Sequence, residues 1–154
     1  SWSFNGALIK SRVNFSGTTL MENRPMQGQS PYLVNTGIFY KNEKLQLDAA
    51  LLYNRIGKRI IGVGRSEGTT SGNEALRVPD SYEMPRDVLD LSVSKKFGTH
   101  WEVKANIRDI LAQRVYYKEF VTATLNDGTT KKVEQITRSF KPGRNIGLSI
   151  TYKL

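Results

Sequence analysis

Apolar and polar side chains alternate with a period of two along several runs of this chain. The clearest run, 45–54, places five apolar side chains on one side of an extended backbone: Leu45, Leu47, Ala49, Leu51 and Tyr53. Successive side chains of a strand point to opposite faces of a sheet, so this pattern predicts a strand with one apolar face. Runs of roughly nine to eleven residues also match the length of a strand that crosses a bilayer.

Five further runs share this alternation, which predicts an all-β, antiparallel fold of six strands. Two of the runs are regular, with apolar residues at Leu89, Leu91 and Val93, and at Trp101, Val103, Ala105 and Ile107. The run at the C-terminus carries Ile146, Leu148, Ile150, Tyr152 and Leu154. Two earlier runs are less regular and carry Ala7, Ile9, Val13 and Phe15, and Tyr32, Val34, Ile38 and Tyr40.

The connections between these runs alternate between short and long. Short connections are expected at 41–44 and 98–100, and long ones at 18–30, 62–86 and 114–143. Compact domains rarely carry several long loops at one end of a small sheet, whereas outer-membrane barrels have short periplasmic turns and long extracellular loops. Within the last long connection, Asn126-Asp127-Gly128 predicts a small hairpin. A soluble sheet with one face on a core is the alternative.

Four aromatic residues fall near predicted strand ends, beside the short connections or the C-terminus: Tyr40, Phe97, Trp101 and Tyr152. This placement is typical of the aromatic girdle of an outer-membrane barrel. Core aromatics of a soluble sheet are the alternative, because aromatic residues are enriched in strands generally.

No motif for catalysis is found in the sequence. The chain contains no cysteine, and its single histidine, His100, falls in a predicted turn. Gly62-Val63-Gly64 lacks the third glycine of a dinucleotide loop. Asp48, Asp90 and Asp109 lie on or beside separate predicted strands without the spacing of a metal site. We therefore expect no enzymatic activity, no cofactor and no metal. A spanning helix is also excluded, because no apolar stretch approaches about 20 residues.

The net charge of +9 is concentrated partly in the last long connection. From Arg114 to Arg144 the chain has three acidic residues and seven basic ones. The basic residues are Arg114, Lys118, Lys131, Lys132, Arg138, Lys141 and Arg144. Such a basic loop can attract anionic ligands or lipopolysaccharide phosphates, although a solvated loop surface is the preferred explanation. Nucleic-acid binding needs aromatics interleaved with basic residues on one face. Here aromatics and charges mostly occupy opposite faces, so no nucleic-acid partner is expected.

Several segments resemble the TonB-dependent receptor family. They are Gln27-Gly28-Gln29-Ser30-Pro31-Tyr32-Leu33-Val34-Asn35, 51–59, 82–90, Lys95-Lys96-Phe97, 103–113 with Arg108-Asp109-Ile110-Leu111, and 143–154. The sequence of these segments is most similar to that of Bacteroidetes-type receptors that carry a carboxypeptidase-regulatory-like domain ahead of the plug. The chain departs from the family in ending with Leu154 where phenylalanine is common, and in lacking the plug, the TonB box and the earlier strands.

The resemblance implies an antiparallel transmembrane β-barrel of the 22-stranded type, in which 1–154 supplies the last six strands. Because the chain starts at Ser1 without a signal segment, we expect it to be a piece of a longer receptor. The implied location is the outer membrane. The implied partners are membrane lipid, the plug and earlier strands of the receptor, TonB acting through that plug, and a small nutrient ligand. The ligand itself is not implied.

Polar positions of the runs give candidates for the barrel lumen and its ligand: Asn35, Asp48, Asn54, Asp90, Ser92, Lys104, Asn106, Arg108, Ser149 and Thr151. A bulge shifts this parity by one residue, and we expect such a shift between Asn54 and Arg59. Two rival functions remain, a soluble basic antiparallel β-domain that binds polyanions, and a cell-surface structural or adhesin-like β-module. In either rival the apolar side chains are buried together inside the protein, whereas in a receptor barrel they point to lipid.

Overall fold

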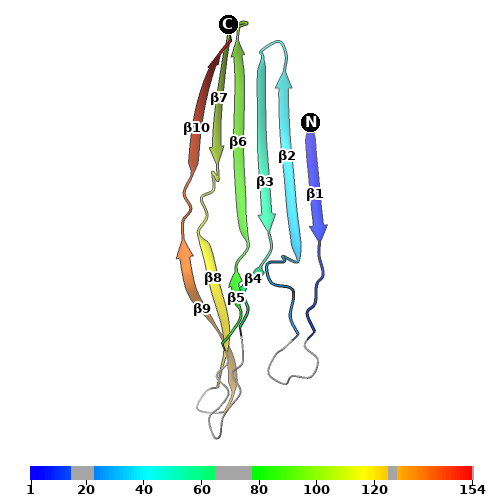
Figure 1. Ribbon diagram of the computed structural model, residues 1–154, viewed down its shortest axis with the longest axis vertical. Coiled ribbons are helices and arrows are strands. Elements are labelled where there is room, and N and C mark those ends of the chain that lie inside the picture. Colours follow the sequence, from blue (N-terminus) through cyan, green and yellow to red (C-terminus); the bar gives the residue numbers. More distant parts are fainter. Residues whose placement is uncertain (15–22, 65–77, 125–127, 154) are drawn as a thin grey trace.

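The computed structural model describes residues 1–14, 23–64, 78–124 and 128–153, which form two antiparallel sheets (Figure 1). The all-β, antiparallel prediction is confirmed. No helix long and apolar enough to cross a membrane occurs in this part of the chain.

The larger sheet contains the six predicted strands in the order β1-β2-β3-β6-β7-β10. Their bounds are β1 Trp2–Leu8, β2 Tyr32–Asn42, β3 Leu47–Ile56, β6 Arg86–Phe97, β7 Trp101–Arg108 and β10 Asn145–Tyr152. Each neighbouring pair is antiparallel. The outer edges of the sheet are β1 and β10, which are not paired with each other. Figure 1 shows these strands side by side as a single layer.

Three of the four strands of the smaller sheet lie within 62–86 and 114–143, which the sequence assigns to long connections, and the fourth lies mostly before residue 62. The strands of this sheet are β4 Arg59–Gly62, β5 Ser81–Glu83, β8 Val115–Thr124 and β9 Thr130–Phe140. They pair in the order β4-β5-β8-β9. This order repeats that of the larger sheet, because β4 follows β3, β5 precedes β6, β8 follows β7 and β9 precedes β10. The predicted hairpin is confirmed as β8 and β9 and is longer than expected, while 125–127 lie outside the described residues.

Short and long connections lie at opposite ends of the larger sheet (Figure 1). The connection at 98–100 is placed as predicted, whereas the other spans 43–46 because β2 extends to Asn42. Leu45 therefore lies in a turn and not in the strand to which the alternation assigned it. The Asn42 Oδ1 atom accepts a hydrogen bond from the Leu45 N–H group at 3.0 Å, and Gln46 has a φ of 49°, which together close the turn.

The first predicted run is corrected in both position and register. β1 ends at Leu8, and Val13 makes only an isolated bridge with Arg24. Ala7 lies opposite Leu33, whereas Phe4 and Leu8 share the other face. Pairing along the whole of β1 with 32–38 of β2 fixes this register. Trp2, Phe4 and Leu8 alternate with Ser3 and Asn5 in the same register, but the prediction followed the apolar residues that come later in the chain. Phe15 lies outside the described residues.

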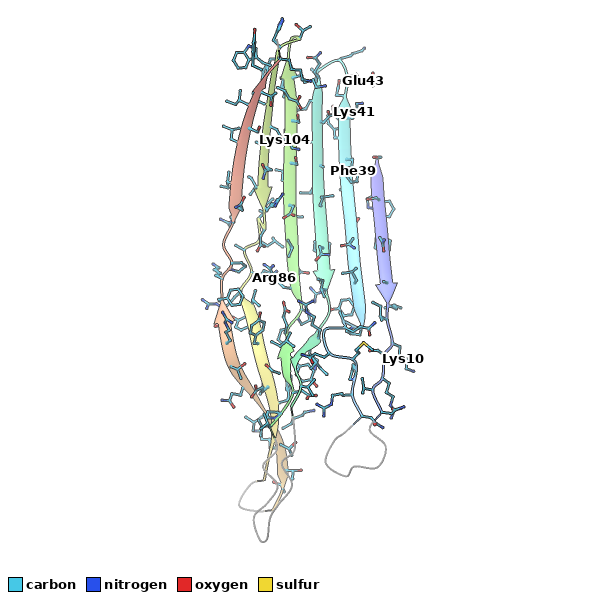
Figure 2. All side chains as sticks on the ribbon, viewed as in Figure 1. Lys10, Phe39, Lys41, Glu43, Arg86 and Lys104 are labelled. Atoms are coloured by element: carbon cyan, nitrogen blue, oxygen red, sulfur yellow. The ribbon has the colours of Figure 1, made fainter. Side chains whose placement is uncertain are left out.

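Four strands of the larger sheet are interrupted where the smaller sheet begins. We call this level, formed by 57–58, 84–85, 109–114 and 141–144, the junction. Pro85 has no N–H group for a ladder hydrogen bond. Asp109 and Gly143 adopt φ values of 54° and 82°, which interrupt an extended chain. Figure 2 labels Arg86 at this level.

Buried apolar side chains are confined to the junction and the smaller sheet. In the described part of the chain they are Ile60, Ala112 and Val115. The larger sheet has no core of its own, because no described element covers either of its faces.

Candidate functional site

One face of the larger sheet, which we call the polar face, carries all ten predicted lumen residues. Directly paired residues of adjacent strands share a face. The pairs include Asn35 with Asn54, Ser92 with Asn106, and Lys104 with Ser149. Parity along each strand then places the others on the same face: Asp48, Asp90, Arg108 and Thr151. Figure 2 labels Lys104 on β7.

The sequence missed further members of the polar face. Asn5 lies opposite Asn35 and was missed because the first strand was placed too far along the chain. Glu102 and Ser94 are joined by a hydrogen bond of 3.1 Å from Ser94 Oγ, and their parity in the predicted runs could have identified them. Five large apolar residues are exceptions on this face: Leu33, Phe39, Leu52, Ile56 and Val88.

A row of three amides crosses the polar face near the junction. Asn5, Asn35 and Asn54 are consecutive cross-strand neighbours, and Asn54 Nδ2 donates a hydrogen bond to Asn35 Oδ1. A depression of about 300 Å³ lies over this row. Gly37 shapes it, because a Cβ atom there would come within 2.9 Å of the Leu52 side chain. The amides offer both donors and acceptors to a ligand or to another part of the protein.

The opposite face of the larger sheet, the apolar face, is lined by aliphatic and aromatic side chains. None of its residues is buried, and the edge residues are widely exposed: Leu8 is 92% exposed, Ile146 74% and Leu148 69%. Phe97, Trp101 and Tyr152 lie opposite one another across three strands at the short-connection end, and Tyr40 shares their face. The predicted positions of these four aromatics at that end are confirmed. The Trp101 and Tyr152 ring centroids are 4.9 Å apart.

At the junction the apolar face ends in a polar network around Asp87. The Asp87 carboxylate accepts hydrogen bonds from Tyr53 Oη and Arg55 Nη1, both at 2.6 Å, and from Gln113 Nε2 at 3.3 Å. Gln113 Oε1 in turn accepts a hydrogen bond from the Asp87 N–H group at 3.0 Å. The sequence missed this network, although Arg55 and Asp87 are the charged positions at which the apolar parity of β3 and β6 stops.

On the polar face the junction holds a second ion pair, between Arg86 and Asp109. The Asp109 N–H group donates a hydrogen bond to Asp90 Oδ1 at 2.8 Å, so two of the three candidate carboxylates lie together while Asp48 lies apart. Arg86 balances one of these charges. In the described ranges no group of three or more potential metal ligands is found.

A parity shift between Asn54 and Arg59 is expected from the sequence, and the residues of both parities that line a depression at the junction are in keeping with it. Asn54 and Ile56, at even positions, line the same depression as Arg59 and Glu83, at odd positions. Arg59 and Glu83 form an ion pair at 2.7 Å on this side. On β3 the polar face therefore consists of even-numbered residues, and on β4 and β5 it continues through odd-numbered ones. The apolar face continues through the even-numbered residues of β4 and β5.

The seven basic residues of the last connection do not form one cluster. Lys118 pairs with Glu134, and the Arg138 guanidinium lies 5.2 Å from the Phe140 ring centroid. Lys131 and Lys132 are consecutive on β9 and point to opposite faces. The other members are tied locally or exposed: Arg114 donates to Ser139 Oγ, Arg144 donates to Ile110 O, and Lys141 lies exposed at the junction.

Two other titratable groups have defined surroundings. His100 lies exposed in the turn between β6 and β7, where its ring stacks on Tyr152 with centroids 5.8 Å apart. Burial of Tyr82 in β5 raises the pKa of its phenol, and the negative charge of Asp80 raises it further. Neither environment pairs a nucleophile with a base.

Comparison with models of known protein families, with curated proteins and with solved structures finds no match to this chain. The assignment of function therefore depends on the two faces of the larger sheet and on the order of its connections.

Proposed function

We propose that this chain is a wall segment of an outer-membrane β-barrel receptor of the TonB-dependent type. In this proposal the apolar face contacts lipid, the polar face lines the lumen, and the long connections with the smaller sheet lie outside the cell. The segment catalyses no covalent reaction and holds no cofactor. The complete receptor, including the plug and the earlier strands, imports a small nutrient when TonB acts on that plug.

The apolar face is the observation that carries this proposal. Apolar side chains predominate on it over six strands, and none of its residues is buried by another element of the described chain. An uncovered apolar surface of this extent is unfavourable in water, because apolar area contributes about 25 cal/mol per Å² when it is removed from water. Lipid tails cover such a surface without any further protein layer.

The height of the apolar face supports lipid as its partner. On β6 the face is bounded by Asp87 at the junction and by Phe97 at the short-connection end. Ten residue steps correspond to about 33 Å along a strand, or about 25 Å across a membrane at a tilt of roughly 40°. Lys95, the charged residue of the face near that end, lies with its Nζ atom 5.3 Å from the Phe97 ring centroid. Lysine at a membrane boundary extends its ammonium toward water in this way.

The unpaired outer edges of β1 and β10 also support a larger assembly. Unsatisfied backbone groups in hydrocarbon cost several kcal/mol each. In our proposal the earlier strands of the receptor pair with both edges and close the barrel. The ten lumen residues and Asn5 then face the plug and the translocated ligand, and the smaller sheet contributes to an external vestibule.

A soluble, polyanion-binding domain and a surface adhesin-like module both require the apolar face to be covered by protein. The basic residues of β8 and β9 point to both faces of the smaller sheet, which does not favour binding to one extended polyanion. The first test is fractionation of the chain expressed with and without its natural upstream sequence. We expect it to require detergent or membranes, and a soluble, cooperatively folding monomer would overturn the proposal.

Adjacent single cysteines give a matched test of the two faces. The chain has no native cysteine, so Leu91→Cys and Ser92→Cys each introduce one thiol at neighbouring positions of β6. In membranes we expect Ser92→Cys to react with a water-soluble maleimide, and Leu91→Cys to be protected from it and quenched by a lipid-borne quencher after labelling. Equal reaction of both thiols with the water-soluble reagent contradicts the assignment of lipid and lumen.

A further inference from the structure

Beyond the junction, two lysines and two aromatic rings form a cluster on one face of the smaller sheet. The Lys58 Nζ atom lies 4.4 Å from the Tyr82 ring centroid and 4.8 Å from the Phe120 ring centroid. The Lys132 Nζ atom lies 5.9 Å from the Phe120 ring centroid. The two rings contact each other edge to face at 5.6 Å. Three strands and the junction thus bring two ammonium groups over the same ring.

Neither ammonium group of this cluster is neutralised within the described part of the chain. The ion pairs there do not include Lys58 or Lys132. Glu134 lies on the same face, but its carboxylate is already held by Lys118. Lys58 and Lys132 are both exposed. The cluster therefore presents two accessible positive charges, oriented by aromatic rings, with unused hydrogen-bond donors.

The cluster lies on the continuation of the apolar face. Arg59 and Glu83 continue the polar face across the junction, so Tyr82, which neighbours Glu83 in the strand, points to the other side. Tyr82 lies directly opposite Lys118, and Phe120 is two residues from Lys118 on β8, so Tyr82 and Phe120 share a face. Phe120 lies directly opposite Glu134, and Lys132 is two residues from Glu134 on β9, so Lys132 shares that face as well. In the orientation of the proposed function, this position lies just outside the lipid-covered band, at the level of lipid headgroups.

We propose that the cluster binds the phosphate groups of lipids in the outer leaflet and so fixes the depth of the wall in the membrane. This inference rests on the proposed function, because it needs the apolar face to contact lipid. Ammonium groups donate charge-assisted hydrogen bonds to phosphate oxygens, and amphipathic aromatic rings favour the boundary between apolar and aqueous regions. Lys131, the neighbour of Lys132, points to the opposite face and has no part in the site.

The test uses the full-length receptor in neutral detergent, with lipid A as the probe and native mass spectrometry as the readout. Each lysine near a charged lipid surface contributes a factor of about five in affinity, so we expect Lys132→Gln to bind about 5-fold more weakly and Lys58→Gln/Lys132→Gln about 25-fold more weakly. The matched control Lys131→Gln should change affinity by less than about 2-fold. Retained heat-modifiable migration in electrophoresis shows that each variant is folded.

Three outcomes overturn the inference while leaving the proposed function intact. One is a wild-type protein that inserts into membranes but binds no lipid A. Another is equal binding by Lys131→Gln and Lys132→Gln. The third is displacement of lipid A by inorganic pyrophosphate at an equal concentration, which identifies a site for soluble anions. A wild-type chain that does not enter membranes with its upstream sequence overturns the proposed function itself, so the two failures are distinguishable.

Discussion

The two sheets are built from consecutive stretches of the same strands, yet they follow different rules. In the larger sheet apolar and polar side chains occupy separate faces, and no residue of the apolar face is buried. In the smaller sheet aromatic and charged residues share each face, as with Lys58 over Tyr82 on one side and Arg138 over Phe140 on the other. Alternation is therefore a property of the larger sheet alone. The smaller sheet is stabilised by individual pairs of side chains.

Arginine substitutions on the two faces test this contrast with the largest expected effect. We expect Leu91→Arg or Leu148→Arg to destabilise the inserted protein by about 2–4 kcal/mol, because the charge enters the lipid-facing surface. Ser92→Arg and Ser149→Arg, at the next positions on the polar face, should cost much less. Unfolding by urea in lipid vesicles measures the difference. Equal losses on both faces contradict the separation.

Alanine substitutions at Gly57, in the junction, and at Gly62, the last residue of β4, test how tightly the junction is packed. At Gly57 a Cβ atom would lie 2.7 Å from the Tyr32 ring and 2.9 Å from Ser30 Oγ, whereas at Gly62 it would lie 3.5 Å from the Ser81 Cβ atom. Gly57→Ala should cost about 2 kcal/mol through overpacking. Gly62→Ala should be nearly neutral in the same urea titration. An equal loss of stability in the two variants would show that the close contacts at Gly57 do not determine the cost of the substitution.

The Asp87 network predicts a smaller effect at the boundary between the sheets. Asp87→Asn keeps the shape of the side chain but removes the charge that holds Arg55 and Tyr53. We expect a loss of about 1 kcal/mol, limited by partial solvent exposure. Asp48→Asn is the control, because Asp48 is exposed on the polar face. If the two variants are equally stable, the network does not strengthen the junction.

The smallest effect is expected in the smaller sheet. Removing the Lys118–Glu134 ion pair by Lys118→Gln, Glu134→Gln and both together should reveal a coupling of less than about 1 kcal/mol, because Glu134 is half exposed. The coupling should also fall as salt is added. A double-mutant cycle measured at low and high ionic strength checks this. A larger, salt-independent coupling would show that the smaller sheet is more enclosed than its exposure indicates.

The sequence predicted the larger sheet well because its two faces carry side chains of different polarity. For Leu51, Leu91 and Ile150 a period of two alone gives the correct face, and the same parity placed the ten polar residues together. The first strand was placed too far along the chain, although Trp2, Phe4 and Leu8 alternate with Ser3 and Asn5 in the register that pairing with β2 shows. The end of this strand at Leu8 follows from that long-range pairing and not from a local pattern.

The smaller sheet and the junction were not predicted for a different reason. Both faces of β8 and β9 carry charged residues, so hydrophobic periodicity gives no signal there. The pairs Arg55–Asp87 and Arg86–Asp109 join residues that lie far apart in the sequence. Pro85 marked a break in one strand, but the coincidence of four breaks at one level follows only from the pairing of the strands.

The change of parity at the junction has a consequence for how such chains diverge. A one-residue insertion within β3 or β6 moves every side chain beyond it to the opposite face of the sheet. Apolar side chains then lie on the polar face and polar side chains on the apolar face. At 141–144 the backbone leaves the ladder and every residue is exposed, so an added residue is absorbed locally. The hairpin of β8 and β9 can therefore change length without regard to odd or even residue number. Natural variation in length should concentrate beyond the junction, while the larger sheet keeps a constant span.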